Sequence, residues 1–292
     1  MEMTTTLQFH SPIVASLSSQ LSRSFPPCNY NQKQNPIPFH TRPIGSTVTS
    51  RKSLTAACSL LDGAPLSPNV DAVERSLAVK KKAMGVSSQL KGTSIFLLGI
   101  NNSVKSSMGK LLADVLRYYY FDSDSLVIEA AGGESAAKSL RESDAKGFRE
   151  SETEVLKQLS SMGRLVVCAG DGAVQSSTNL ALIRHGISLW IDVPLDLVAR
   201  EMIQDQDQHP TSDISISESE SEVLTQLITQ YEEMRSGYST ADATVSLQKV
   251  ATLVGCDDLN AVTAEDVTME VLKEIERLTR VKKMMEAAAT PF

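Results

Sequence analysis

The fold of this chain is decided by one stretch, Ile95-Phe96-Leu97-Leu98-Gly99-Ile100-Asn101-Asn102-Ser103-Val104-Lys105-Ser106. A compact apolar run that ends in glycine is typical of a buried parallel strand leading into a loop. From Gly99 onward the residues follow the Walker A pattern of glycine, four residues, glycine, lysine and serine or threonine, except that Val104 replaces the second glycine. The stretch therefore predicts a strand, a phosphate-binding type of loop and a helix.

The same alternation continues along the chain. Further strands are predicted at 119–121, 165–168, 188–193 and 243–247. Helices are predicted between them, at 126–140, 148–162, 180–184, from Pro194, at 223–235 and from Ala264 to about Met285. Strands alternating with helices indicate an α/β fold, a P-loop NTPase-type parallel β-sheet with helices on both faces.

Val104 is expected to disturb the loop. A P-loop wraps backbone N–H groups around phosphate, and its sharp turns need dihedrals that favour glycine. Valine is β-branched, and holding one strained residue costs about 1–3 kcal/mol. We therefore expect a loop that carries Val104 to relax to another shape.

The motifs around this stretch resemble those of the shikimate kinase family. They are the strand and Lys105-Ser106, then Phe121-Asp122-Ser123-Asp124, Phe148-Arg149-Glu150, Gly170-Asp171-Gly172-Ala173-Val174 and Trp190-Ile191-Asp192-Val193-Pro194, in the family's order. The resemblance runs from about Thr93 to the C-terminus and implies a shikimate kinase-like domain over 93–292. It is most similar to the plant plastid branch of the family that is described as inactive and implicated in chloroplast development.

The resemblance assigns vestigial roles to residues that match the family's motifs. Gly99, Lys105 and Ser106 would contact the nucleotide, with Ser106 and Asp122 near the magnesium ion. Asp124, Arg149 and Gly172 would contact shikimate, Asp124 as candidate base and Arg149 on the carboxylate.

The resemblance also identifies substitutions that would disable the site. Asn102 and Val104 replace loop glycines, and Asp171 replaces the middle glycine of the family's substrate turn. His209 stands where the lid's arginine is expected, and Ser239 stands where a second substrate-binding arginine is expected after Tyr238. A carboxylate at Asp171 would repel anionic ligands, by about 4 kcal/mol for two like charges about 4 Å apart.

Structural roles for these residues remain open alternatives. Lys105 and Ser106 could be leftovers at a helix N-terminus, and Asp122 and Asp124 could cap the following helix. Arg149 could bridge nearby acids. Asp171 could itself bind a cation or a hydroxyl group.

The segment 1–57 reads as a plastid transit peptide that is disordered. It is rich in serine, threonine and proline, and it contains five basic residues but one acidic residue, Glu2. Residues 58–92 are predicted to form a linker and a lead helix, from Val70 to Met84 and ended by Gly85. The polar stretch 204–222 is predicted to be the lid loop.

Composition excludes several classes of function. The net charge is -7, and the chain after the leader has 23 bases against 34 acids, which argues against nucleic-acid binding. No apolar run is long enough to span a bilayer. The four cysteines are far apart, which argues against a zinc site or disulfide framework.

The leading hypothesis is a pseudoenzyme in the plastid stroma, not an active enzyme, with no required cofactor and an unknown protein partner. Its role in chloroplast biogenesis is implied by the resemblance alone. A second hypothesis is an ATP-dependent kinase of a different small hydroxylated substrate, and a third is an ATP-binding sensor without turnover. In both of these, residual binding of ATP and magnesium would persist.

Overall fold

A five-stranded parallel sheet forms the centre of the protein. The computed structural model describes residues 68–208 and 220–289. The strands are β1 (Ile95–Leu98), β2 (Tyr119–Asp122), β3 (Leu165–Cys168), β4 (Ile187–Asp192) and β5 (Ala243–Ser246). Their order in the sheet is β2-β3-β1-β4-β5, and every neighbouring pair is parallel. The predicted α/β fold is therefore confirmed.

The central strand β1 is covered on both faces, since its four residues are no more than 1% exposed. Its register places Leu97 beside Cys168 of β3 and Leu189 of β4. The carboxyl ends of these strands therefore share one edge of the sheet, where the motif residues after each strand converge.

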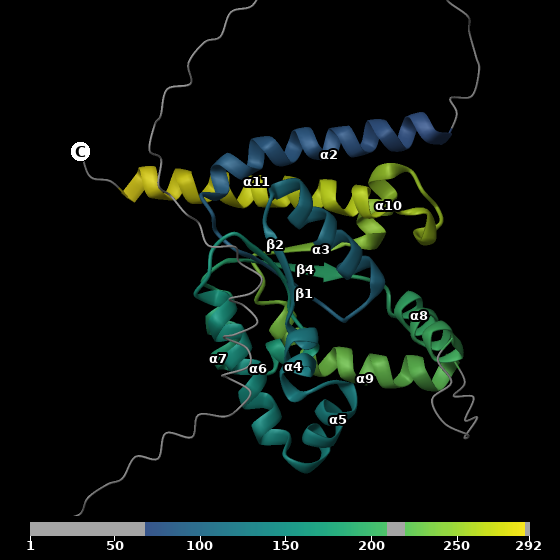
Figure 1. Ribbon diagram of the computed structural model, residues 1–292. Helices are drawn as coiled ribbons and strands as arrows, with labels where there is room; N and C mark the ends of the chain where they lie inside the picture. Colours follow the sequence, from purple (N-terminus) through teal and green to yellow (C-terminus); the bar gives the residue numbers. More distant parts are fainter. Residues whose placement is uncertain (1–67, 209–219, 290–292) are drawn as a thin grey trace, which may run out of the picture.

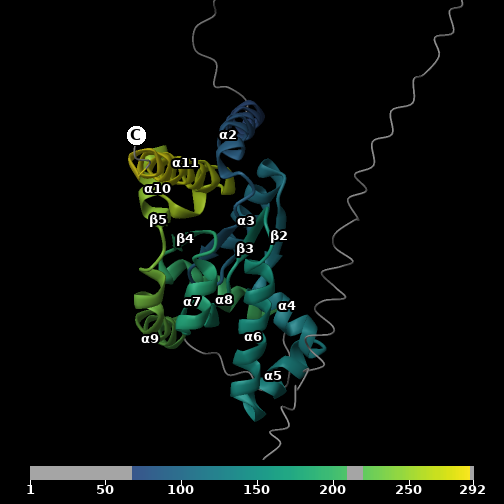
Figure 2. The ribbon, with the colours of Figure 1, turned by 90° about the vertical axis from the view of Figure 1, so that its left-hand side faces the viewer.

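Helices lie on both faces of the sheet (Figures 1 and 2). On one side are α3 (Ser103–Leu116) and α11 (Ala264–Ala289), with α2 (Pro68–Leu90) outside them. On the other side are α6 (Ala145–Ser160) and α7 (Ser177–Ile183). The remaining helices are α4 (Ser123–Ala131), α5 (Glu134–Ser143), α8 (Leu195–Gln208), α9 (Glu220–Tyr238) and α10 (Leu247–Val254), with short 3₁₀ turns at Asp171–Val174 and Leu259–Ala261.

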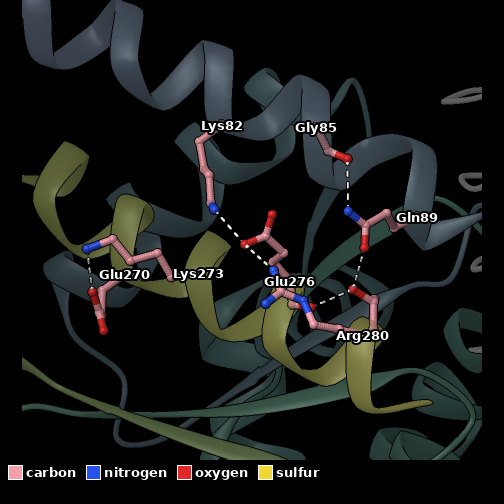
Figure 3. Close-up of polar contacts among 8 residues, drawn as sticks. Lys82, Gly85, Gln89, Glu270, Lys273, Glu276 and Arg280 are labelled. Carbon is pink, nitrogen blue, oxygen red and sulfur yellow. Dashed lines mark hydrogen bonds and ion pairs between the residues drawn. The ribbon is translucent and has the colours of Figure 1, made fainter. Parts of the chain in front are cut away.

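The helix α2 runs beside α11 in the same direction (Figure 3). Lys82 makes an ion pair with Glu276 at 2.7 Å, and further along both helices the Thr279 hydroxyl lies 3.2 Å from the side-chain oxygen of Gln89. The buried face of α2, with Val79, Ala83, Val86 and Leu90, packs into the core.

Several predicted boundaries were wrong. The lead helix continues through Gly85 to Leu90, because tertiary packing of its apolar face outweighs the cost of one glycine. The helix expected over 126–140 is two helices, separated by Gly132 and Gly133 with positive φ. Within the expected lid loop, α8 extends to Gln208 and α9 begins at Glu220.

The predicted leader, 1–57, lies outside the described residues, as does most of the expected lid. No helix within 68–208 and 220–289 is long and apolar enough to cross a bilayer.

Candidate functional site

The Walker A-like segment connects the end of β1 to the start of α3 through a turn of four residues, 99–102. Gly99 has φ +125°, and a Cβ there would lie 2.4 Å from the carbonyl oxygen of Ile191. Only glycine fits this close approach to β4. The chain then turns into α3, which begins at Ser103.

Lys105 is completely buried and points back under this turn. Its Nζ donates to the carbonyl oxygen of Gly99 at 2.6 Å, to Oδ1 of Asn101 at 2.6 Å and to the carbonyl oxygen of Ala169 at 3.1 Å. A lysine ammonium has three donors, so all three are used within the protein.

The N-terminus of α3 is capped by two side chains. Oδ1 of Asn102 accepts from the N–H of Lys105 at 2.8 Å, and its amide donates to the carbonyl oxygen of Ile100 at 2.7 Å. The carboxylate of Glu201, from α8, accepts from the N–H of Ser103 at 2.6 Å and from its hydroxyl at 3.0 Å. A carboxylate thus lies at the helix end where backbone N–H groups and the helix dipole attract anions.

Val104 does not hold a strained conformation in this segment. It lies in the first turn of α3 and packs partly against the core. The residues other than glycine with positive φ in the described chain are Lys91, Arg117 and Arg164. Helical dihedrals at position 104 are ones that valine adopts without strain, so the expectation that the loop relaxes around Val104 is not contradicted.

Two residues assigned to magnesium make structural contacts. Burial raises the pKa of Tyr120 in β2, and the nearby side chain of Ser106 acts in the opposite direction. Asp122 is the N-cap of α4, and its Oδ1 accepts from the N–H of Ser125 at 2.9 Å. Among residues 68–208 and 220–289, no group of three or more potential ligands is arranged to hold a metal ion.

Asp124 is held beside the turn by Asn101, whose side-chain amide donates to Oδ2 of Asp124 at 2.7 Å. Its carboxylate lies against Gly170, where an added Cβ would be 1.6 Å from Oδ1 of Asp124. Asn101 therefore bridges Lys105 and Asp124 through its two side-chain atoms. Only glycine at position 170 leaves room for this arrangement.

A cavity of about 260 Å³ opens next to Asp124. Its charged lining consists of three carboxylates, Asp124, Glu152 and Asp171, and two guanidinium groups, Arg141 and Arg149. The remaining lining residues are Ala145, Phe148, Gly172, Gln175 and Gln230. The structure thus brings together four of the predicted site residues, Asp124, Arg149, Asp171 and Gly172.

Asp171 is fixed by α9. The hydroxyl of Tyr238 lies 3.4 Å from its Oδ1, and the amide of Gln230 donates to its Oδ2 at 3.3 Å. The carboxylate that Asp171 adds to this turn therefore has polar partners in α9, the hydroxyl of Tyr238 and the amide of Gln230.

The three cavity carboxylates share one electrostatic pattern. Burial raises the pKa of Asp124, and the charges of Asp122 and Asp171 raise it further. Burial also raises the pKa of Asp171, against the lowering effect of Lys105. For Glu152, burial and the charge of Asp124 raise the pKa to about 7, although Arg149 and Arg141 act in the opposite direction. Such a cluster favours neutral or proton-donating ligands over anionic ones.

Arg149 lines the cavity and donates to the side chain of Gln175. Ser239 does not reach it, because it lies exposed after α9 with its hydroxyl bonded to the carbonyl oxygen of Ser236 at 2.7 Å. His209 lies outside the described residues.

Sequence reasoning missed Glu201, Asn101 and Glu152. Glu201 is 98 residues from Ser103, and nothing in its local pattern marks it as a cap. Glu152 follows Arg149 by three positions, so helical spacing would have placed both on one face of α6.

Comparison with known proteins agrees with the fold. A model of the shikimate kinase family matches residues 101–273. A shikimate kinase from Acinetobacter baumannii, solved in complex with shikimate, superposes with a TM-score of 0.52 at 22% identity, covering 66% of this chain and 97% of that one. This likeness concerns the fold alone.

Two plant relatives are closer in sequence. An Arabidopsis thaliana protein named "Probable inactive shikimate kinase like 1, chloroplastic" is 55% identical over 256 residues, covering 88% of this chain and 85% of that protein. "Shikimate kinase 2, chloroplastic" from Oryza sativa subsp. japonica is 39% identical over 207 residues, covering 70% and 67%. This chain therefore belongs to the shikimate kinase family.

Proposed function

We propose that this protein is a catalytically inactive shikimate kinase homologue that acts in the chloroplast stroma through a non-catalytic binding or regulatory role needed for chloroplast development. The chloroplast location is supported by the names of the plant relatives, which are described as chloroplastic. The relative that is 55% identical is also named as inactive.

One observation supports the proposal: Lys105 and the N-terminus of α3, the groups that the resemblance assigns to a nucleotide phosphate, are already bound by the protein's own oxygens. Lys105 already has three oxygen partners, and the carboxylate of Glu201 already occupies the N-terminus of α3. A phosphate would have to displace that carboxylate and share the lysine. Losing two hydrogen bonds to charged groups costs about 3 kcal/mol, which is about a hundredfold in affinity.

The residues present therefore do not fit ATP and magnesium well. Asp122 caps α4, and its Oδ1 already accepts from the N–H of Ser125.

The retained cavity favours a second candidate function, the binding of a small hydroxylated ligand without turnover. Asp124, Glu152 and Asp171 can accept from hydroxyl groups, whereas their charge disfavours the carboxylate of shikimate. A comparison of shikimate with its methyl ester separates hydroxyl binding from charge repulsion, because the ester has the same ring hydroxyls but lacks the negative charge. Stabilisation of the full chain by the ester but not by the acid supports this second function.

The test of the main proposal is a rescue experiment in a plant line that lacks the protein. Asp124→Asn removes the candidate base while Oδ1 of the new amide can still accept from Asn101. We expect this variant to restore chlorophyll content as fully as the wild type, and both purified proteins to show no shikimate-dependent ATP consumption.

A fold control is needed, so the thermal midpoint of the variant is measured beside that of the wild type. Failure of a normally folded Asp124→Asn protein to rescue, together with measurable turnover by the wild type, would contradict the proposal.

A further inference from the structure

A second cavity lies at the opposite edge of the sheet, where the strands begin. It has a volume of about 380 Å³ and is formed by the end of α2, the turn before β1, the turn between α7 and β4, and α11. Thr93 and Ile187, which line it, are at the amino ends of β1 and β4. The cavity is therefore separate from the candidate site at the carboxyl ends.

The lining of this second cavity is rich in cations although the chain as a whole is acidic. Lys91, Arg184, Lys282 and Lys283 line it, together with His185. Within residues 68–208 and 220–289, none of the four cationic side chains has an ion pair or other polar side-chain partner.

The contrast is clear along α11. Lys273, Arg277 and Arg280 are each paired with a glutamate one turn away, and Figure 3 shows the pairs of Lys273 and Arg280. Thr279, Lys282, Lys283 and Glu286 lie at the spacing of one helix face and line the cavity, and the two lysines come after the last of these paired cations. The unpaired lysines thus begin where α11 faces the cavity.

The carboxylates in the lining do not neutralise these cations. Oδ2 of Asp242 is already bonded to the N–H of Ser188 at 2.8 Å and to its hydroxyl at 2.9 Å. Glu286 is the other acid, so four cations face two carboxylates. The ends of α2 and α7 account for cations at Lys91 and Arg184, since helix C-termini favour positive charge. They do not account for Lys282 and Lys283, which precede the end of α11 by several residues.

We propose that this second cavity binds a small phosphorylated metabolite. Phosphate groups match an excess of lysine and arginine donors, with arginine able to bind two oxygens at once. Leu90, Ile187 and Leu278 add an apolar wall for the body of the ligand. The volume falls within the roughly 300–1,000 Å³ of small-molecule sites, which fits a metabolite better than a protein segment.

Inorganic pyrophosphate, without magnesium, is the minimal probe. Its effect on the thermal midpoint of the full chain is compared with that of sodium chloride at equal ionic strength. Ten millimolar pyrophosphate acting on a millimolar site should raise the midpoint by about 4 °C. Lys282→Glu combined with Lys283→Glu should abolish the rise.

Lys80→Glu combined with Lys81→Glu is the matched control, since these exposed neighbours on α2 do not line the cavity and have no ion pair with another described residue. It should respond as the wild type does. If the rise is absent in the wild type, survives in the Lys282/Lys283 variant, or is lost equally in the control, the proposal is overturned.

The milder Lys282→Gln, Lys283→Gln variant guards against misfolding and should also lose the rise. Pyrophosphate bound at the Walker A-like segment would still raise the midpoint of both Lys282/Lys283 variants. Failure of the second-cavity proposal is therefore distinguishable from failure of the proposed function.

Discussion

Glu201 accepts two hydrogen bonds from Ser103, one from its backbone N–H at 2.6 Å and one from its hydroxyl at 3.0 Å. The carboxylate of α8 thereby takes the position at the start of α3 that suits an anion. An internal anion there competes with any phosphate that would bind the same N–H groups.

Removal of this cap should have two effects. Glu201→Ala is expected to lower the free energy of unfolding by about 1 kcal/mol, as loss of an N-terminal capping partner does. It should also let sulfate stabilise the protein more than it stabilises the wild type, which denaturation with and without sulfate will show. Asp196→Ala on the same helix, an exposed residue paired with Arg200, is the control. Equal sulfate responses of Glu201→Ala and wild type would argue against an internal anion.

Lys105 should be a structural residue. Lys105→Met leaves the carbonyl oxygens of Gly99 and Ala169 without their buried donor, and we expect a loss of about 3 kcal/mol in the free energy of unfolding, measured by urea denaturation. Lys110→Met, on the exposed side of the same helix near the Tyr120 ring, should cost less than about 1 kcal/mol. If both variants lost a similarly small amount of unfolding free energy, Lys105 would not be held by the three buried hydrogen bonds.

Glu152 should make stability depend on pH. Because its pKa is raised in the folded state from 4.5 to about 7, the folded protein binds more protons than the unfolded chain between these values. This contribution to stability is present in full below about pH 4.5 and is lost as pH rises to about 7. Glu152→Gln should therefore be more stable than the wild type above pH 7, with the difference shrinking toward pH 5. Glu150→Gln, at an exposed neighbour that pairs with Lys146, is the control for this comparison of thermal midpoints.

The charges that raise the pKa of Glu152 can be ranked. The charge of Asp124 has a larger effect than the charge of Asp171. In carboxyl-carbon NMR titrations, Asp124→Asn should lower the pKa of Glu152 most and Asp171→Asn less. A reversed order would show that the cavity is arranged differently.

Much of the fold was predictable from the sequence because the strands are short apolar runs with clear ends. Leu165–Cys168 has the predicted bounds, β2 is one residue longer at its carboxyl end, and β4 is shifted by one residue toward the N-terminus. The helix α10 was missed because its first residue, Leu247, was assigned to the preceding strand. Packing explains the continuation of α2 through Gly85, which local propensity could not show.

The candidate site was predictable only in part. Asp124, Arg149, Asp171 and Gly172 meet in one cavity because their motifs follow parallel strands or face the same edge. Glu201 acts across the fold on Ser103, and a contact of this kind has no local signature in the sequence. Val104 lies unstrained in the first turn of α3, as a loop that has relaxed around a valine would place it.

The central claim is that the chain's own groups occupy the nucleotide-phosphate position, and calorimetric titration of the full chain with Mg-ATP tests it most directly. At about 1 mM Mg-ATP we predict no saturable heat for the wild type. We predict measurable binding for a variant combining Asn102→Gly, Val104→Gly and Glu201→Ala. Saturable binding of Mg-ATP to the wild type would contradict the account.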